Sequence, residues 1–101
     1  IIDYNNLQSL TTVDKTLNLE PINSKFIAFG WDVFCVDGHN HQQIRIALEN
    51  AKNANNSKPK VIIANTIKGF GVSFMENQVK WHYKSPSSEE LSIAIKEINN
   101  A

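Results

Sequence analysis

Two short apolar runs, separated by a segment with helical periodicity, constrain the fold of this 101-residue chain most strongly. Residues 31–36 and 61–64 are largely apolar and β-prone, which is typical of strands covered on both faces of a parallel sheet. Between them, apolar side chains recur at helical spacing, which predicts a helix with one buried face. These side chains are Ile44, Ala47, Leu48 and Ala51. The order strand, helix, strand predicts a right-handed βαβ unit with adjacent parallel strands.

Polar residues mark where the helices of this pattern begin. Asn40 is expected to cap the helix between the two strands, with Gln43 in the capping-box position three residues later. Ser87 and Glu90 repeat this pattern before a last helix. The apolar stripe of the last helix comprises Leu91, Ala94, Ile95 and Ile98.

The rest of the chain predicts short elements and one long loop. Residues 1–4 are typical of the end of a buried strand, and residues 24–30 predict a short helix that Gly30 ends. Residues 69–84 form a loop with little periodicity, which is more often functional than idle at this length. We therefore expect an α/β fold with a partial parallel sheet of two or three strands and flanking helices. Residues 1–101 should form a single segment, and its start in mid-strand suggests a piece of a larger protein.

Charge and cysteine content exclude several classes of protein. Ten basic residues balance ten acidic ones without a basic run, so we expect no nucleic-acid partner. No apolar run approaches the roughly 20 residues that span a bilayer, and no segment resembles a signal peptide. The single cysteine allows no internal disulfide and suits a reducing compartment. A soluble, cytoplasmic protein is therefore expected.

Oxygen ligands follow the first predicted strand. In open α/β sheets, ligands bind outside the carboxyl ends of strands, and Asn5 comes directly after such an end. An Asn side-chain oxygen and a backbone carbonyl two residues later are suitable ligands for Mg²⁺ or Ca²⁺. A strand followed by an Asx turn explains the same residues without any ligand.

A cation and two glycines follow the second apolar run. Gly69 and Gly71 allow the backbone to pass close to a bulky ligand, and Lys68 can neutralise phosphate charge. An ordinary turn with a solvated lysine is the alternative. His82 lies in an aromatic, basic segment, and a neutral imidazole there can donate a hydrogen bond or relay a proton. A histidine of a surface loop is the alternative for this residue.

Three further residues have side chains that often carry chemistry. His39 and His41 lie near a helix start, but no Cys/His partner pattern supports zinc, so turn and capping roles are preferred. Cys35 lies inside an apolar strand and is expected to be buried and inert.

Taken together, these segments resemble the transketolase family over nearly the whole chain and in the family's order. F-G-W at residues 29–31 is similar to the family's entry to a strand, and V-D-G-H at residues 36–39 to its following turn. Residues 58–71 match the family's segment K-P-x-x-I-I-A-x-T-x-K-G-x-G. M-E-N at residues 75–77 and W-H at residues 81–82 match its later signatures. The resemblance is to the later half of the family's diphosphate-binding domain.

The resemblance implies an enzyme that uses thiamine diphosphate and a divalent metal, Mg²⁺ or Ca²⁺. Such enzymes transfer a two-carbon ketol unit between sugar phosphates, as in the pentose phosphate pathway. The resemblance places Asn5 as a metal ligand through its side chain, and Leu7 as a metal and cofactor contact through its backbone carbonyl. It places Lys68 beside the cofactor and His82 near the diphosphate and the reacting carbon, where the family's histidine assists proton transfer.

The chain departs from the family pattern in ways that leave alternatives open. It has no G-D-G motif, so the metal would lack its main carboxylate. Tyr83 stands where the family has a glycine after the W-H histidine. This tyrosine keeps open a related thiamine diphosphate enzyme with a different sugar or acyl substrate. A non-catalytic interaction remnant of the fold is a further alternative.

The resemblance also implies partners, because the family builds its site at a dimer interface. The glutamate that activates the aminopyrimidine belongs to another domain, and this chain would supply part of one wall of the site. Expected partners are a sugar phosphate substrate and a pyrimidine-binding domain of the same enzyme or of a separate subunit, in a homo- or hetero-oligomer. The chain alone is expected to be inactive.

Overall fold

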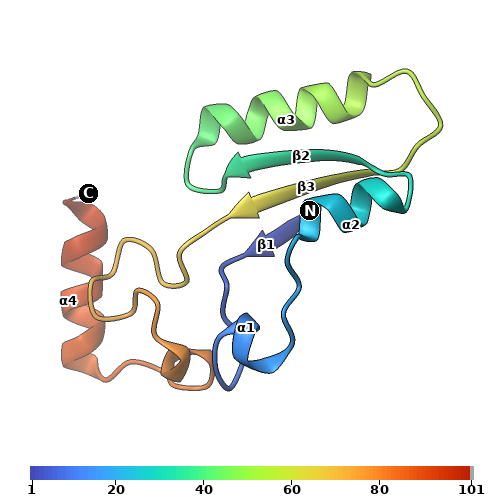
Figure 1. Cartoon of the computed structure of the whole chain (residues 1–101). Helices are drawn as coiled ribbons and strands as arrows, with labels where there is room; N and C mark the ends of the chain where they lie inside the picture. Colours follow the sequence, from blue (N-terminus) through green and yellow to red (C-terminus); the bar gives the residue numbers. More distant parts are fainter. Residues whose placement is uncertain (101) are drawn as a thin grey trace. The chain divides into compact units, whose positions relative to one another are not determined.

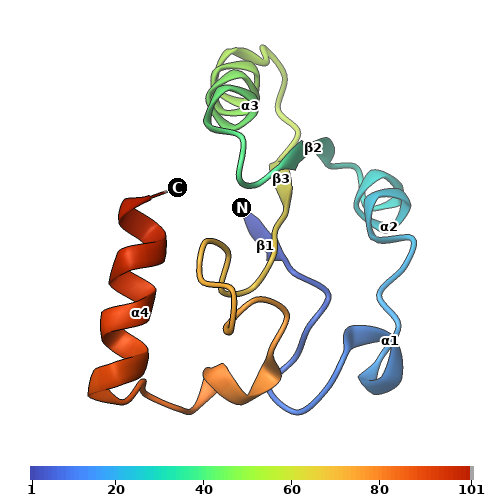
Figure 2. The same ribbon diagram turned by 90° about the vertical axis from the view of Figure 1, so that its left-hand side faces the viewer.

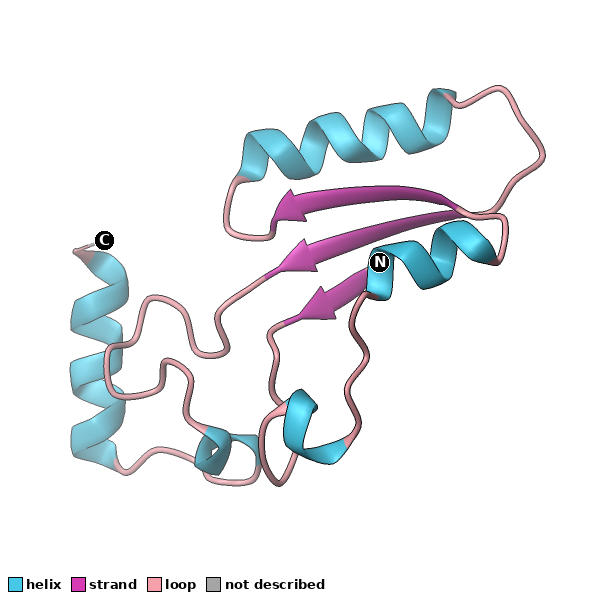
Figure 3. Cartoon of the chain, in the orientation of Figure 1, coloured by secondary structure: helices cyan, strands magenta, loops and turns pink. Residues whose placement is uncertain are grey.

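Three parallel strands form the sheet of this protein. The computed structural model describes residues 1–100. The strands are β1 (Ile2–Tyr4), β2 (Asp32–Asp37) and β3 (Lys60–Asn65), in the spatial order β1-β3-β2. Both pairs are parallel, and the three arrows in Figure 3 point the same way. The predicted α/β fold class with a partial parallel sheet is confirmed.

The helices connect and follow these strands (Figure 1). The helices α1 (Val13–Thr16) and α2 (Ile22–Ala28) precede β2, and α3 (His41–Asn53) joins β2 to β3. A 3₁₀ helix, η1 (Val79–His82), and α4 (Ser88–Asn99) follow β3. The predicted βαβ unit is therefore β2, α3 and β3, and it is confirmed. In the part of the chain that the structure describes, no helix is long and apolar enough to cross a membrane.

The chain divides into two compact units, which are described separately. The first unit comprises Ile1–Asn5 and Leu17–Thr66, and it contains the sheet with α2 and α3. The second comprises Asn6–Thr16 and the chain from Ile67 onward, and it contains α1, η1 and α4. The expectation that the whole chain is one segment of a larger domain stays a prediction.

The core of the first unit lies on both faces of β3. Successive residues of a strand point to opposite faces, and here Val61 and Ile63 pack in one cluster with Ile22 of α2. Ile62 packs in the other cluster with Ala47 of α3. Figure 2 shows α2 and α3 on opposite sides of the sheet. The prediction of a fully buried second strand is confirmed, because all four residues from Val61 to Ala64 are buried.

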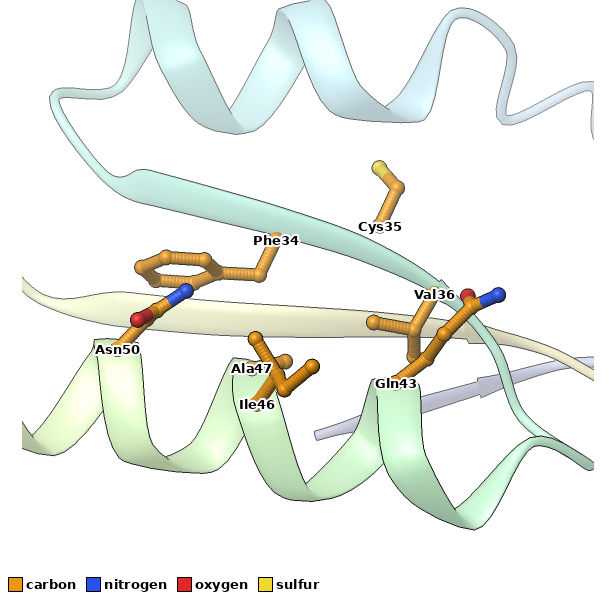
Figure 4. A pocket seen from close by; sticks show the side chains of 7 residues that line it. All are labelled: Phe34, Cys35, Val36, Gln43, Ile46, Ala47 and Asn50. Atoms are coloured by element: carbon orange, nitrogen blue, oxygen red, sulfur yellow. The ribbon is translucent and has the colours of Figure 1, made fainter.

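The prediction that β2 is covered on both faces is wrong at Cys35, which is exposed. The physical reason is the length of α2, which has seven residues and therefore spans only about 10 Å. It packs on Trp31 and Val33 near the start of the strand, and the same face is left uncovered farther along. In Figure 4 the Cys35 side chain points away from α3, whereas Phe34 and Val36 lie on the α3 side.

The helix starts agree closely with the prediction. Asn40 caps α3 by accepting a hydrogen bond from the Gln43 amide at 3.1 Å. The Gln43 side chain does not close a capping box, because its Oε1 accepts from the Asp37 amide at 2.9 Å instead. The capping box of Ser87 and Glu90 on α4 is complete.

Two of the predicted helices differ in detail from the expectation. The first begins at Ile22 rather than at residue 24, because the Glu20 carboxylate accepts a hydrogen bond from the Ile22 amide at 3.0 Å and so satisfies a group at the helix start. Its end is as expected, since Gly30 follows with a φ of 85°. The buried face of α3 is narrower than predicted, because Ala47 is buried but Leu48 is 46% exposed.

Replacing Ile63 tests the central position of β3. Ile63 is 1% exposed and lies in the middle of the central strand. Ile63→Ala should lower the free energy of unfolding by about 2–5 kcal/mol, because it leaves a cavity that the neighbouring strands cannot fill. Urea denaturation measures this change. Ile27→Ala is the matched control, since Ile27 is 61% exposed on α2 and the change should stay within about 0.5 kcal/mol. Equal effects of the two variants would contradict the core described here.

Candidate functional site

The three strands end level with one another. Tyr4 of β1 pairs with Asn65 of β3, and Asn65 pairs with Asp37 of β2. These are the last residues of the three strands. The carboxyl edge of the sheet is therefore flush, which is where ligands bind in open α/β sheets. Asn5, the predicted metal ligand, is the first residue beyond this edge on β1 and is partly buried.

A buried tyrosine holds the end of β1. The Tyr4 hydroxyl donates a 2.6 Å hydrogen bond to Glu20 Oε1, and the other oxygen of Glu20 accepts from the Ile22 amide. The hydrogen bond from Tyr4 is the main reason that the pKa of Glu20 lies below its usual value, and the same bond raises the pKa of Tyr4. Glu20 therefore ties the residue before Asn5 to the start of α2.

Thr66 fastens β1 to the end of β3 at the same edge. Its amide donates to the Tyr4 carbonyl at 3.2 Å, and its hydroxyl donates a hydrogen bond to Asp3 Oδ1. Gly38, in the turn after β2, also lies against this residue. A Cβ on Gly38 would come within 2.4 Å of Thr66 Cγ2 and 3.0 Å of the Asn65 carbonyl oxygen. The glycine of the V-D-G-H turn is therefore required by close packing.

In the second unit, Leu7 lies in a tight turn. Asn6 has a φ of 59°, a left-handed conformation that Asn adopts more readily than most residues. Leu7 forms an isolated antiparallel bridge with Thr12, and the Gln8 amide donates to the Thr11 carbonyl at 2.7 Å. The Val13 amide closes the turn on the Asn6 carbonyl at 3.0 Å. These bonds fix the backbone around Leu7, whose carbonyl is a predicted metal ligand.

Lys68 begins a loop that closes on itself, which we call the glycine limb (residues 68–77). The Asn77 amide donates to the Lys68 carbonyl at 2.9 Å, and the Gly71 amide donates to Glu76 Oε1 at 3.1 Å. Gly69 has a φ of 76°, and a Cβ there would come within 2.6 Å of the Met75 carbonyl oxygen. The glycine is therefore explained by packing within the limb itself. Among residues 1–100, no carboxylate forms an ion pair with the Lys68 ammonium.

His82 ends the 3₁₀ helix in an exposed position. Its ring lies edge-on against Tyr83, with centroids 4.6 Å apart and planes at 89°. The neighbouring Trp81 anchors this segment, because its indole N–H donates to the Phe74 carbonyl at 3.0 Å. The Lys84 ammonium lies 4.5 Å from the centroid of the Trp81 ring. The segment around His82 (residues 79–84), which we call the histidine limb, is thus held by its tryptophan.

The predicted site residues lie in different units. Asn5 belongs to the first unit, and Leu7, Lys68 and His82 belong to the second. Their convergence on one ligand stays a prediction.

Taken one by one, the groups of the predicted site residues suit a diphosphate better than a bare metal ion. Lys68 supplies a cation, and His82 supplies a hydrogen-bond donor, which suit phosphate oxygens. Asn5 and Leu7 supply only neutral oxygens. Within residues 1–100, no group of three or more His, Cys, Asp or Glu side chains is placed to hold a metal ion. A metal ion held by these neutral oxygens would therefore need further oxygen ligands.

Other features that the sequence singled out lie elsewhere. His39 lies in the turn after β2, where its amide donates to Asp37 Oδ1 at 2.9 Å, and His41 is the first residue of α3. A pocket of about 340 Å³ lies between β2 and α3 and contains none of the predicted site residues (Figure 4). It is lined by Phe34, Cys35, Val36, Gln43, Ile46, Ala47 and Asn50.

Three carboxylates accept hydrogen bonds that order segments of the two units, and none of these bonds was predicted from the sequence. Glu20 binds Tyr4, Glu76 binds Gly71, and Glu97 binds Ser73. Glu20 and Glu97 act on residues 16 and 24 positions away in the sequence. For Glu20 a local signal was available, since Glu20 and Pro21 directly precede a helix and a carboxylate there can accept a hydrogen bond from the helix start.

Comparisons with known proteins agree with the sequence pattern. The model of the family described as "Transketolase, thiamine diphosphate binding domain" matches residues 1–98. The chain is 37% identical over 99 residues to one subunit of the apulose-4-phosphate transketolase of Phocaeicola vulgatus. It is 41% identical over 96 residues to 6-deoxy-6-sulfo-D-fructose transketolase subunit SqwG of a Clostridium species. Its fold matches the crystal structure of transketolase from Campylobacter jejuni with a TM-score of 0.85 and 31% identity.

The chain spans only part of each of these proteins. The alignment with the Phocaeicola protein covers 98% of this chain and 35% of the relative, and that with the Clostridium protein covers 95% and 34%. The match to the Campylobacter structure covers 96% of this chain and 15% of that one. The chain thus corresponds to about a third of the length of the first two relatives.

Replacing Gly38 tests the packing at the carboxyl edge. Gly38→Ala should destabilise the chain by about 1–3 kcal/mol, because the new methyl group overlaps the Thr66 methyl group. Adding Thr66→Ser should restore part of the loss, since serine lacks that methyl group and keeps the hydroxyl that binds Asp3. Thermal unfolding of the two variants, with Thr66→Ser alone as the control, measures both effects. A Gly38→Ala chain as stable as the unmodified one would show that this contact is not tight.

Proposed function

The chain belongs to the transketolase family, and from that premise we propose that it supplies part of the cofactor site of a thiamine diphosphate-dependent transketolase. The parent enzyme transfers a two-carbon ketol unit between sugar phosphates. The observation that carries the proposal is Lys68, a partly buried cation without a carboxylate partner among residues 1–100, on a loop that closes on itself. The match of residues 1–98 to the thiamine diphosphate-binding domain supports it.

Each predicted site residue has a defined task in this proposal. Lys68 neutralises charge on the diphosphate. The Asn5 side chain and the Leu7 carbonyl contribute oxygens to the Mg²⁺ or Ca²⁺ ion that accompanies the diphosphate. His82 donates a hydrogen bond near the diphosphate and the reacting carbon and assists proton transfer there. When bound, thiamine diphosphate supplies the carbanion chemistry, and these residues orient it.

The rest of the site comes from a partner. We propose that a pyrimidine-binding domain, in the same enzyme or in a separate subunit, closes the site in a homo- or hetero-oligomer. Two of the relatives are named as subunits, which supports a split enzyme. We also propose that the metal ion is Mg²⁺, that the enzyme works in the cytoplasm and that its reaction belongs to the pentose phosphate pathway.

Tyr83 favours a second candidate within the family, an enzyme with a different sugar or acyl substrate. Tyr83 is 76% exposed and its ring packs against His82, so a substrate near His82 would meet an aromatic side chain. The relatives are named for apulose 4-phosphate and for 6-deoxy-6-sulfo-D-fructose, which are unlike each other. Tyr83→Gly separates the candidates, since it should change the ratio of kcat/KM between sugar phosphates only if Tyr83 borders the substrate.

Removing the lysine tests the proposed cofactor contact. In the complete enzyme that carries this chain, Lys68→Ala should raise the Kd for thiamine diphosphate by about 10- to 100-fold, because one charge-assisted hydrogen bond is lost. Calorimetric titration with thiamine diphosphate in Mg²⁺ measures the change. Lys52→Ala is the control, because Lys52 is an exposed lysine in the last turn of α3. An unchanged Kd for Lys68→Ala would show that Lys68 does not contact the cofactor, and it would favour a non-catalytic role for the chain.

The chain alone should bind thiamine diphosphate weakly and should transfer no ketol unit. The reason is its set of ligands, which contains neutral oxygens for the metal and no carboxylate. The half-site would also leave the reacting groups in water. Calorimetry of the purified chain with thiamine diphosphate and Mg²⁺ provides the measurement. Micromolar affinity, or any ketol transfer, would contradict this expectation.

A further inference from the structure

Helix α4 holds the glycine limb through one carboxylate. Glu97, in the last turns of α4, accepts two hydrogen bonds from Ser73, one from the amide at 2.6 Å and one from the hydroxyl at 2.7 Å. Ser73 lies five residues after Lys68 in the limb. The two bonds lower the pKa of Glu97, with the backbone bond as the larger cause, so the carboxylate is the form that binds.

A second carboxylate of the same helix holds the histidine limb. Glu90 Oε1 lies 2.8 Å from the Lys84 ammonium, and Lys84 follows His82 by two residues. The other oxygen of Glu90 accepts from the Ser87 amide and completes the capping box. The capping bond therefore holds the Glu90 side chain in place on the helix, and its other oxygen binds Lys84.

The spacing of these two carboxylates makes α4 a rigid spacer. Glu90 and Glu97 are seven residues apart, which is about two helical turns and about 10 Å of rise, so they project from nearly the same side. Each carboxylate binds a different limb of the second unit. The helix thus adds a second connection between the two limbs, beside the direct hydrogen bond from the Trp81 indole to the Phe74 carbonyl.

We propose that Glu97 is a positioning residue for the diphosphate-binding lysine: by binding Ser73 it fixes the glycine limb on α4 and so sets the place of Lys68 relative to His82. The inference rests on the proposed function, since it gives this contact a purpose in cofactor binding. It also follows from the packing of the limb, in which Val72 is the one buried side chain among residues 68–77. With so little apolar burial, polar bonds must order the limb, and ordering before binding strengthens affinity.

The first test observes the limb without any cofactor. In a ¹H–¹⁵N spectrum of the 101-residue chain, Glu97→Ala should shift the Ser73 amide and broaden amides of residues 68–77. Glu89→Ala is the matched control, because it removes a carboxylate at the start of the same helix, where it accepts a hydrogen bond from the Ser87 hydroxyl. Its spectrum should leave the glycine limb unchanged. A Ser73 amide that is insensitive to Glu97→Ala would overturn the proposal.

The second test measures cofactor binding in the complete enzyme. Glu97→Ala should raise the Kd for thiamine diphosphate about tenfold, while kcat at saturating cofactor stays within about twofold. Ser73→Ala should have a smaller effect, because its amide still donates to Glu97. Ser73→Ala also replaces Glu97→Ala as the test variant if Glu97→Ala fails to fold, because it removes the hydroxyl bond to Glu97. A fall in kcat with unchanged Kd, or equal effects of Glu97→Ala and Glu89→Ala, would refute the positioning role.

The two proposals fail in different ways. If Lys68→Ala weakens thiamine diphosphate binding and Glu97→Ala does not, the proposed function stands and the positioning role is wrong. If neither substitution changes the Kd, the proposed function itself is wrong.

Discussion

The burial of the four middle residues of β3 is the constraint on which the first unit depends. Val61 to Ala64 are buried, with alternate side chains packed toward α2 and toward α3. A strand with apolar groups on both faces and hydrogen-bonding partners on both edges can only be central. The central strand then fixes the register of both neighbours, since β1 and β2 each pair with it and not with each other. The flush carboxyl edge of the sheet is a consequence of that register.

Polar contacts organise much of the chain that follows this edge. Thr66 binds both Asp3 and the Tyr4 carbonyl, and the glycine limb closes through hydrogen bonds among its own residues, to the Lys68 carbonyl and to the Glu76 carboxylate. Carboxylates of α4 then hold the limbs. In the proposed function, the apolar sheet supports the loops, and residues of the loops bind the diphosphate.

The sequence predicted those parts of the fold that depend on near neighbours along the chain. The βαβ unit and the capping box of Ser87 and Glu90 are confirmed, because apolar periodicity and capping act within a few residues. The exposure of Cys35 could not be predicted, since it depends on how far a seven-residue helix reaches over the sheet. The Glu97 contact was equally hidden, because a carboxylate on an amphipathic helix gives no sign of a partner 24 residues away. The placement of Asn5, Leu7, Lys68 and His82 around one ligand stays a prediction.

Paramagnetic broadening by Mn²⁺ in place of Mg²⁺ tests that placement most directly, because it reports proximity even when binding is weak. The measurement is a ¹H–¹⁵N spectrum of the labelled chain with Mn²⁺, with and without thiamine diphosphate. We expect the amides of Asn5, Leu7, Lys68 and His82 to broaden together only when Mn²⁺ and thiamine diphosphate are both present, while amides at the middle of α3 stay sharp. Broadening that is the same without thiamine diphosphate, or that spares Lys68 while affecting Asn5, would contradict a shared cofactor site.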